Sequence, residues 1–190
     1  MKMKTLVDQI EGLRVPYIVG ISGFGGSGKS TLARELSHGI NAPVVGVDSF
    51  VRSLDEQASE NWEIVDFDEL FESVILPFKR NESPLNFCEM DWQTGKRDRQ
   101  KIIENIGKII VEGVGLFRRP IIDYLDFSIW INLPLEESIA QGKLRDKENY
   151  QRNNDEKWDG IWKKNDLEYF ERERPMSRAT LLWDTAIQTN

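Results

Sequence analysis

The stretch Gly23-Phe24-Gly25-Gly26-Ser27-Gly28-Lys29-Ser30 decides how the rest of this chain is interpreted. Its glycines allow backbone conformations that are closed to other residue types, and they leave no side chain between the backbone and a ligand. Successive N–H groups can therefore converge on an anion, at the positive end of a helix that begins near Ser30. The spacing satisfies G-x-x-x-x-G-K-[ST], the P-loop or Walker A pattern. The stretch predicts a site for the phosphate groups of a nucleotide.

The segments on either side of the motif agree with this interpretation, because the motif needs a strand before it and a helix after it. Residues 17–22 form a short apolar run, as expected of a buried parallel strand. Leu32, Ala33 and Leu36 recur at helical spacing, and Gly39 is expected to cap that helix. A glycine-rich turn that matches by chance is the alternative, and it does not explain both flanks.

Within the motif, Lys29 is expected to reach the β- and γ-phosphate oxygens of ATP, and the Ser30 hydroxyl is expected to bind Mg²⁺. The full set of residues predicted to hold the nucleotide is Phe24, Gly25, Gly26, Ser27, Gly28, Lys29, Ser30 and Thr31.

The composition describes a single domain spanning residues 1–190. The net charge of −7 disfavours binding to nucleic acid, which depends on clustered Lys and Arg side chains. Cys88 and His38 are the only residues of their types, so the sequence excludes an intramolecular disulfide, a cysteine zinc site and a histidine-dependent triad. No segment resembles a signal peptide or a bilayer span, so a cytoplasmic protein without a membrane partner is expected. The oligomeric state stays open.

Four further apolar runs, residues 44–48, 109–113, 127–133 and 179–183, alternate with helical segments. This alternation predicts a three-layer α/β fold, the P-loop NTPase fold, with a five-stranded, mostly parallel sheet and helices on both faces. Ligands of such sheets lie at the carboxyl ends of the strands. We therefore expect the P-loop, Asp48 and Glu112 to meet in one crevice.

Residues 67–78 carry apolar side chains at the spacing of an amphipathic helix. Asp66 and Glu69 resemble a capping box at its start, and Pro77 is expected to end or bend it. Residues 81–108 are polar and rich in turn-forming residues, and no helix or strand is predicted within most of this segment.

Asp48 and Glu112 stand at strand ends, where two carboxylates near a triphosphate have distinct uses. One can accept a proton from an attacking hydroxyl, and the other can organise Mg²⁺. Phe50 follows Asp48 in a loop that is expected to present an acceptor molecule. A carboxylate at a strand end can also merely cap the next helix, and that alternative stays open for both residues.

Several of these segments resemble the uridine kinase and phosphoribulokinase branch of P-loop kinases. The landmarks are Gly23 to Ser30, Val47-Asp48-Ser49-Phe50, Asn61-Trp62-Glu63, Val111-Glu112-Gly113, Leu144-Arg145-Asp146 and features of the carboxyl-terminal third. The resemblance implies that Asp48 is the general base for the acceptor hydroxyl, and that Glu112 lies near Mg²⁺. It also implies that Arg145 belongs to a lid whose arginines neutralise the migrating phosphoryl group, and that Glu63 grips sugar hydroxyls.

The sequence departs from the family pattern at two places. Gln141 and Gly142 replace the first two arginines of the lid motif. Residues 91–95, followed by Arg97, stand where uridine kinases carry the tyrosine and histidine that bind the acceptor. Trp92 and Arg97 are therefore predicted to contact the acceptor, whose identity the sequence leaves open.

A small helical lid is expected at about residues 143–157, where Arg152 would close over the phosphates together with Arg145. A solvated helix end is the alternative for these arginines, since acidic residues balance the charge nearby. The Trp158/Trp162 pair is interpreted as core, although it could stack on a base, and Phe87 is a further candidate for stacking on the acceptor.

The leading hypothesis is an ATP-dependent kinase that transfers the γ-phosphoryl group to a hydroxyl of a small nucleoside-like molecule. One alternative is a kinase for another acceptor, such as pantothenate or a sugar acid. Another is a regulatory NTPase whose output is a conformational change. The guanine-reading N/T-K-x-D segment of GTPases and the signature of ABC-type ATPases are both missing.

Overall fold

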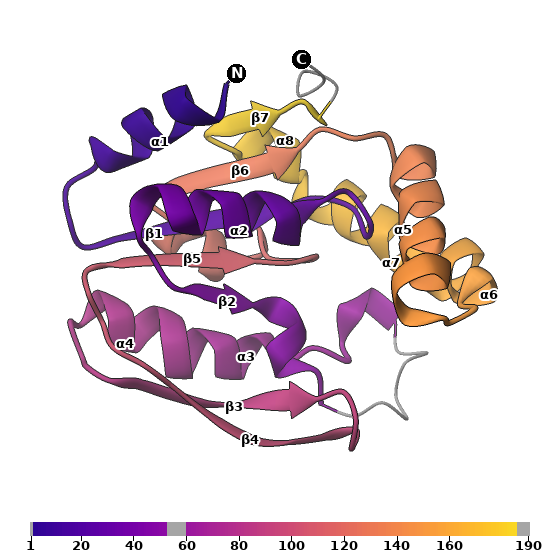
Figure 1. The fold of residues 1–190 in the computed structure, drawn as a ribbon, viewed down its shortest axis with the longest axis horizontal. Coiled ribbons are helices and arrows are strands. Elements are labelled where there is room, and N and C mark those ends of the chain that lie inside the picture. Colours follow the sequence, from indigo (N-terminus) through magenta and orange to yellow (C-terminus); the bar gives the residue numbers. More distant parts are fainter. Residues whose placement is uncertain (1, 53–59, 186–190) are drawn as a thin grey trace.

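The computed structural model describes residues 2–52 and 60–185. Its central sheet has five strands in the order β2-β5-β1-β6-β7 (Figure 1). Their bounds are β1 Tyr17–Ser22, β2 Val44–Gly46, β5 Lys108–Glu112, β6 Phe127–Ile131 and β7 Leu181–Trp183. Each neighbouring pair is parallel. The predicted α/β fold with a parallel sheet is confirmed.

The side chains of the sheet alternate between two hydrophobic cores, because successive strand residues point to opposite faces. Ile18 packs into one core and its neighbour Val19 into the other. Helices α1 (Met3–Glu11) and α2 (Lys29–Ile40) cover the face that carries Val19. Figure 1 shows α2 in front of the central strands and α1 above it at the upper left.

The opposite face is covered by a helical segment and by helices from the carboxyl-terminal third. The segment consists of α3 (Phe67–Leu70), the π-helical η3 (Phe71–Ile75) and α4 (Leu76–Lys79). The later helices on this face are α7 (Ile161–Glu173) and α8 (Pro175–Arg178). Helices α5 (Leu135–Tyr150) and α6 (Asp155–Asp159) lie beside the carboxyl ends of the strands (Figure 1). Short 3₁₀ turns occur at η1 (Val47–Phe50), η2 (Glu60–Trp62) and η4 (Ile121–Tyr124). No described helix is long and apolar enough to cross a membrane.

Gly39 does not cap α2, contrary to the prediction. The helix continues through Gly39 to Ile40, and Asn41 forms the C-cap with φ of 49°. A Cβ atom at position 39 would stand 2.6 Å from Cγ2 of Val7 on α1. The glycine is therefore explained by the close approach of two helices rather than by a helix end.

The helix predicted after Asp66 forms, but it is not uniform. Asp66 Oδ1 accepts a hydrogen bond from the Glu69 N–H at 3.1 Å, so the predicted N-terminal cap is present. The middle of the segment is π-helical, and Pro77 lies at the start of α4 directly after it. A π-turn suits this place because proline has no N–H to donate to the preceding turn.

The segment that the sequence left without elements contains an antiparallel hairpin of β3 (Leu85–Asp91) and β4 (Lys96–Ile103). Strand β4 is almost entirely exposed and charged, so it lacks the apolar alternation from which a strand is recognised. The hairpin matters for the site because its turn carries Trp92.

Candidate active site

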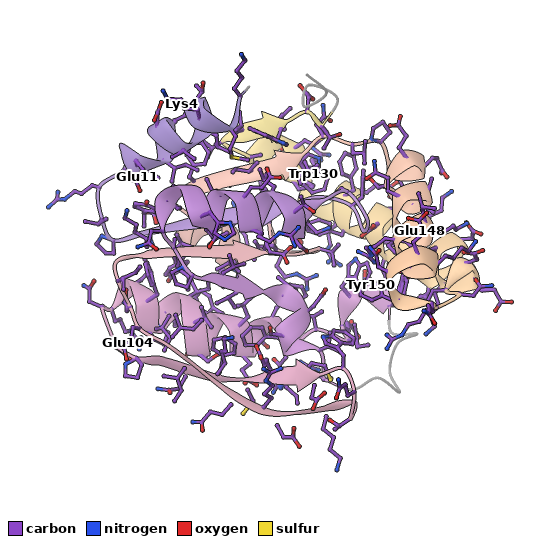
Figure 2. The ribbon with its side chains drawn as sticks, in the orientation of Figure 1. Lys4, Glu11, Glu104, Trp130, Glu148 and Tyr150 are labelled. Atoms are coloured by element: carbon purple, nitrogen blue, oxygen red, sulfur yellow. The ribbon has the colours of Figure 1, made fainter. Side chains whose placement is uncertain are left out.

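A cavity of about 520 Å³ opens at the carboxyl ends of the central strands. Figure 1 shows α5 and α6 on this side of the sheet, and Figure 2 labels Tyr150, a lining residue at the end of α5. The P-loop, the strand-end carboxylates, the lid candidates and the hairpin turn all contribute to its walls. The residues used below are Gly25, Gly26, Lys29, Ser30, Asp48, Trp62, Trp92, Glu112, Arg145, Arg152, Trp158 and Asn165.

The P-loop has the backbone that its glycines predict. Gly26 and Gly28 have φ of 80° and 96°, in the left-handed region that favours glycine. A Cβ atom on Gly26 would stand 2.1 Å from the carbonyl oxygen of Ser138, so α5 packs directly on the loop. Ser27 is buried, and Thr31 is exposed on the first turn of α2.

The Lys29 side chain is 8% exposed and donates a hydrogen bond to the Phe24 carbonyl at 2.7 Å. Burial lowers the pKa of Lys29, while the carboxylates of Glu112, Asp166 and Asp48 act in the opposite direction. The ammonium group therefore lies among anionic partners at the place where the motif positions a phosphate.

Ser30 and Glu112 meet at the end of β5, where the Ser30 hydroxyl donates to Glu112 Oε1 at 3.0 Å. Burial raises the pKa of Glu112, and the nearby Asp48 carboxylate raises it further. A hydroxyl and a carboxylate are hard oxygen donors of the kind that Mg²⁺ prefers alongside phosphate oxygens and water. The pair fits the predicted metal site.

Asp48 lies in η1, two residues beyond the end of β2, because the strand stops at Gly46 rather than at Asp48 as predicted. Its side chain is accessible from the cavity, yet the surrounding protein still raises its pKa. Lys29 and Arg145 oppose that increase. A carboxylate with a raised pKa that faces a cavity is suited to accept a proton.

The predicted lid segment is held together by Asp146, which is 4% exposed. Its carboxylate accepts hydrogen bonds from Trp158 Nε1 and Asn154 Nδ2, each at 2.9 Å, and from Arg145 at 2.9 Å. Burial opposes ionisation, but these hydrogen bonds hold the pKa of Asp146 below its usual value. Arg145 and Arg152 thus line the cavity from an ordered segment.

Trp158 is 4% exposed and packs edge-on against Trp162 at a centroid distance of 4.9 Å. A Cβ atom on Gly142 would stand 2.5 Å from the Trp158 ring, and one on Gly25 would stand 2.9 Å from it. The Trp158 ring therefore occupies the space that a larger residue at position 142 would need. This packing explains why the second arginine of the family's lid motif is a glycine here.

Four residues predicted to contact the acceptor lie outside this cavity: Phe50, Phe87, Arg97 and Glu63. Phe50 is fully buried and its ring stacks on that of Phe87 at 5.2 Å, so both belong to the core. Arg97 forms ion pairs with Asp66 and Glu69 on the flanking helix. Hydrophobic packing holds Phe50 and Phe87 in place, and ion pairs hold Arg97. The spacing of residues in the sequence does not identify the partners in either kind of contact.

Glu63 lines a separate cavity of about 290 Å³ together with Arg52, Phe67 and Arg118. Glu63, which the resemblance assigns to sugar hydroxyls, therefore lines a different cavity from the one that the P-loop lines. Trp92 is 44% exposed and does line the main cavity. Residues 53–59, part of the loop expected to shape the acceptor pocket, lie outside the described residues.

Sequence reasoning missed one buried carboxylate, Asp166 on α7. It is 2% exposed, and its Oδ2 accepts a hydrogen bond from the Gly25 N–H at 2.7 Å. No pattern signals this contact, because 141 positions separate the two residues and Asp166 follows a polar run. A helical wheel that buries Tyr169 would have placed Asp166 on the same face.

Fold and site together define a P-loop protein in which the phosphate loop, the carboxylates of Asp48 and Glu112, and the side chains of Arg145 and Arg152 line one cavity. No protein-family model matches the chain. A uridine kinase from Saccharomyces cerevisiae is 27% identical over 152 residues, which cover 69% of this chain but only 29% of that protein. A uridine kinase from Clostridium botulinum (strain 657 / Type Ba4) is 27% identical over 148 residues, 70% of each chain.

Solved structures share the fold over nearly the whole length. A possible uridine kinase from Bacillus stearothermophilus has a TM-score of 0.71 at 21% identity, covering 95% of this chain and 96% of the other. A proposed fructose transport system kinase from Silicibacter sp. TM1040 has a TM-score of 0.77 at 20% identity, covering 96% and 99%. This chain is thus similar in sequence to proteins named uridine kinase, and it shares its fold with these P-loop kinase structures.

Proposed function

We propose that this protein is an ATP-dependent kinase that transfers the γ-phosphoryl group to a hydroxyl of a nucleoside-like acceptor. The observation that carries the proposal is the single cavity in which Lys29, Asp48 and Arg145 all face the same space. Phosphoryl transfer needs little covalent chemistry from the protein, and it depends on positioning and on charge stabilisation. This cavity supplies groups for both.

Each group has a role that follows from its chemistry. Lys29 draws charge from the β- and γ-phosphate oxygens, while Arg145 and Arg152 stabilise the migrating group from the lid side. Asp48 orients the acceptor hydroxyl and takes its proton. Ser30 and Glu112 would hold Mg²⁺, which when bound supplies positive charge to the phosphate oxygens.

The chemistry of one cavity wall supports an uncharged, flat acceptor. Beyond Asp48 this wall is formed by the uncharged residues Val51, Trp62, Ile64, Val65, Trp92 and Val114. The cationic lining residues of the described chain, Lys29, Arg145 and Arg152, come from the phosphate loop helix and the lid segment. An acceptor with a carboxylate, such as a sugar acid or pantothenate, would lack a cation on this wall.

Two other functions stay in view. One structural relative is named as a proposed fructose transport system kinase, which makes a neutral sugar a second candidate acceptor. The exposed Trp92 favours a nucleobase because it offers an aromatic face for stacking. A regulatory NTPase would use the same phosphate loop but would have no need of a proton acceptor at Asp48.

A screen of purified protein with Mg-ATP against nucleosides, neutral sugars and carboxylate-bearing vitamins and sugar acids tests the proposal. We expect ADP release to depend on a nucleoside. ADP release that depends only on a sugar or an acid would move the acceptor to that class, and hydrolysis without any acceptor would favour the regulatory NTPase.

A further inference from the structure

Asp166 is a buried carboxylate to which the proposed transfer mechanism gives no role. It lies in the first half of α7, and its Oδ2 accepts the Gly25 N–H at 2.7 Å. Gly25 belongs to the stretch whose N–H groups are expected to surround phosphate. A protein anion therefore holds the phosphate loop directly beside the place where a nucleotide anion would bind.

The surroundings of Asp166 leave its charge only partly compensated. Lys29 from α2 is the charged side chain that acts on it, and the Gly25 N–H is its hydrogen-bond donor. The Trp62 indole from η2 also favours the ionised form, but neither Trp62 Nε1 nor Asp166 Oδ1 makes a hydrogen bond of normal geometry among the described residues. Burial raises the pKa of Asp166 to about 6, against these favourable contacts.

A bound triphosphate would add negative charge next to Asp166, and it would interact with the same Lys29 ammonium group. When two acidic groups share a buried site, ionising both has a high cost in free energy, so one of them tends to take a proton. Rotation of Asp166 away from the loop would break its hydrogen bond to Gly25. Protonation at Oδ1 breaks none, because Oδ2 carries that hydrogen bond.

We propose that Asp166 is a positioning residue that holds Gly25 through Oδ2 in both states and takes up one proton at Oδ1 when nucleotide phosphate binds. The proton comes from the solvent and returns to it when the nucleotide leaves. The inference rests on the proposed nucleotide site, and it adds a proton-linked step to nucleotide binding.

Calorimetric titration with a magnesium complex of a non-hydrolysable ATP analogue tests the proton uptake. Measurements at pH 7 in two buffers with different enthalpies of ionisation give the number of protons taken up per site. We expect wild type to take up roughly 0.5 to 1 proton more than Asp166→Asn. Titration of the nucleotide, Asp48 and Glu112 contributes to both proteins and cancels in this difference.

The same linkage fixes a pH dependence. Because the bound state holds more protons, the wild-type Kd should rise relative to that of Asp166→Asn between pH 6 and pH 8, by up to about tenfold per pH unit. Glu168→Gln is the matched control, since Glu168 is an acid on the same helix that pairs with Lys164 instead of the phosphate loop. It should behave as wild type in both measurements.

Asp166→Leu tests the positioning role, because leucine has a similar size but accepts no hydrogen bond. We expect its KM for ATP to rise about tenfold or more, whereas Asp166→Asn, which can still accept from Gly25, should stay within about threefold of wild type. Circular dichroism shows whether the leucine variant folds; if it does not, the calorimetry of Asp166→Asn decides alone.

The outcomes separate this inference from the proposed function. Failure of wild type to bind the analogue would contradict the proposed function itself. Binding with equal proton uptake in wild type and Asp166→Asn would overturn the proton step. Equal KM values for the leucine and asparagine variants would overturn the positioning role.

Discussion

Asp48 is the residue on which proton transfer depends in the proposed reaction. Its raised pKa and its place on the cavity wall fit a general base, and such a base contributes about 10²–10⁴-fold to a rate. We expect Asp48→Asn to lower kcat by that factor while the Kd for ATP changes little. Fixed-time assays of product formation measure kcat, and nucleotide titrations measure the Kd for ATP.

The control for this variant is Asp123→Asn, which makes the same change of charge at an exposed position paired with Arg119. It should leave kcat unchanged. Near-normal turnover of Asp48→Asn on the true acceptor would remove Asp48 from the chemistry.

Asp166 also makes the stability of the folded protein depend on pH. Its folded-state pKa of about 6 lies above the usual 3.8, so the folded state binds more protons and stability falls as pH rises through this window. Asp166→Asn removes this penalty, which amounts to about 3 kcal/mol at most. We expect the variant to melt at a higher temperature than wild type at pH 7.5.

The gain in Tm should shrink as the pH falls and become small near pH 4, where the wild-type carboxyl is protonated in the folded state and partly protonated in the unfolded state. Thermal denaturation across this range checks the prediction. A gain that is the same at pH 4 and pH 7.5 would mean that the asparagine stabilises the protein by a route other than charge.

At the scale of elements, α5 packs against α6 through Gly142 and Trp158, and this contact holds the predicted lid segment beside the phosphate loop. Gly142→Ala adds a methyl group 2.5 Å from the Trp158 ring. Overpacking of this kind costs about 1–3 kcal/mol, and the better helix propensity of alanine offsets up to about 1 kcal/mol. We expect a net loss of stability and weaker nucleotide binding.

Chemical denaturation and nucleotide titration measure these effects. Gln141→Ala, an exposed neighbour on the same helix, is the control and should change stability by only a few tenths of a kcal/mol. A Gly142→Ala protein as stable as wild type would show that the Trp158 ring does not restrict this position.

The elements also show what the sequence can predict. The strand before the P-loop and the helix after it follow from local periodicity, and both form as predicted. Strand β4 was missed because its exposed and charged residues carry no apolar alternation. Gly39 was misassigned as a cap because its closest partner, Val7, lies on another helix and cannot be identified from spacing.

At the scale of the whole molecule, the topology brings the phosphate loop, Asp48 and Glu112 together, and parallel-sheet rules predict this convergence. The same rules do not predict which side chains are held by packing or ion pairs away from the site. Phe50 stacks on Phe87 and Arg97 forms ion pairs, so neither faces the site. Asp166 contacts the phosphate loop although its helix is distant in the sequence. Such pairings depend on tertiary packing, and no local pattern encodes them.

The central claim is that the γ-phosphoryl group of ATP passes to a hydroxyl of a nucleoside-like molecule. Its most direct test is mass spectrometry of the acceptor together with quantification of ADP, in one reaction with Mg-ATP. The account predicts one phosphorylated nucleoside for each ADP formed, with both products falling by about 10²–10⁴-fold in Asp48→Asn. ADP formed without a phosphorylated acceptor would contradict it.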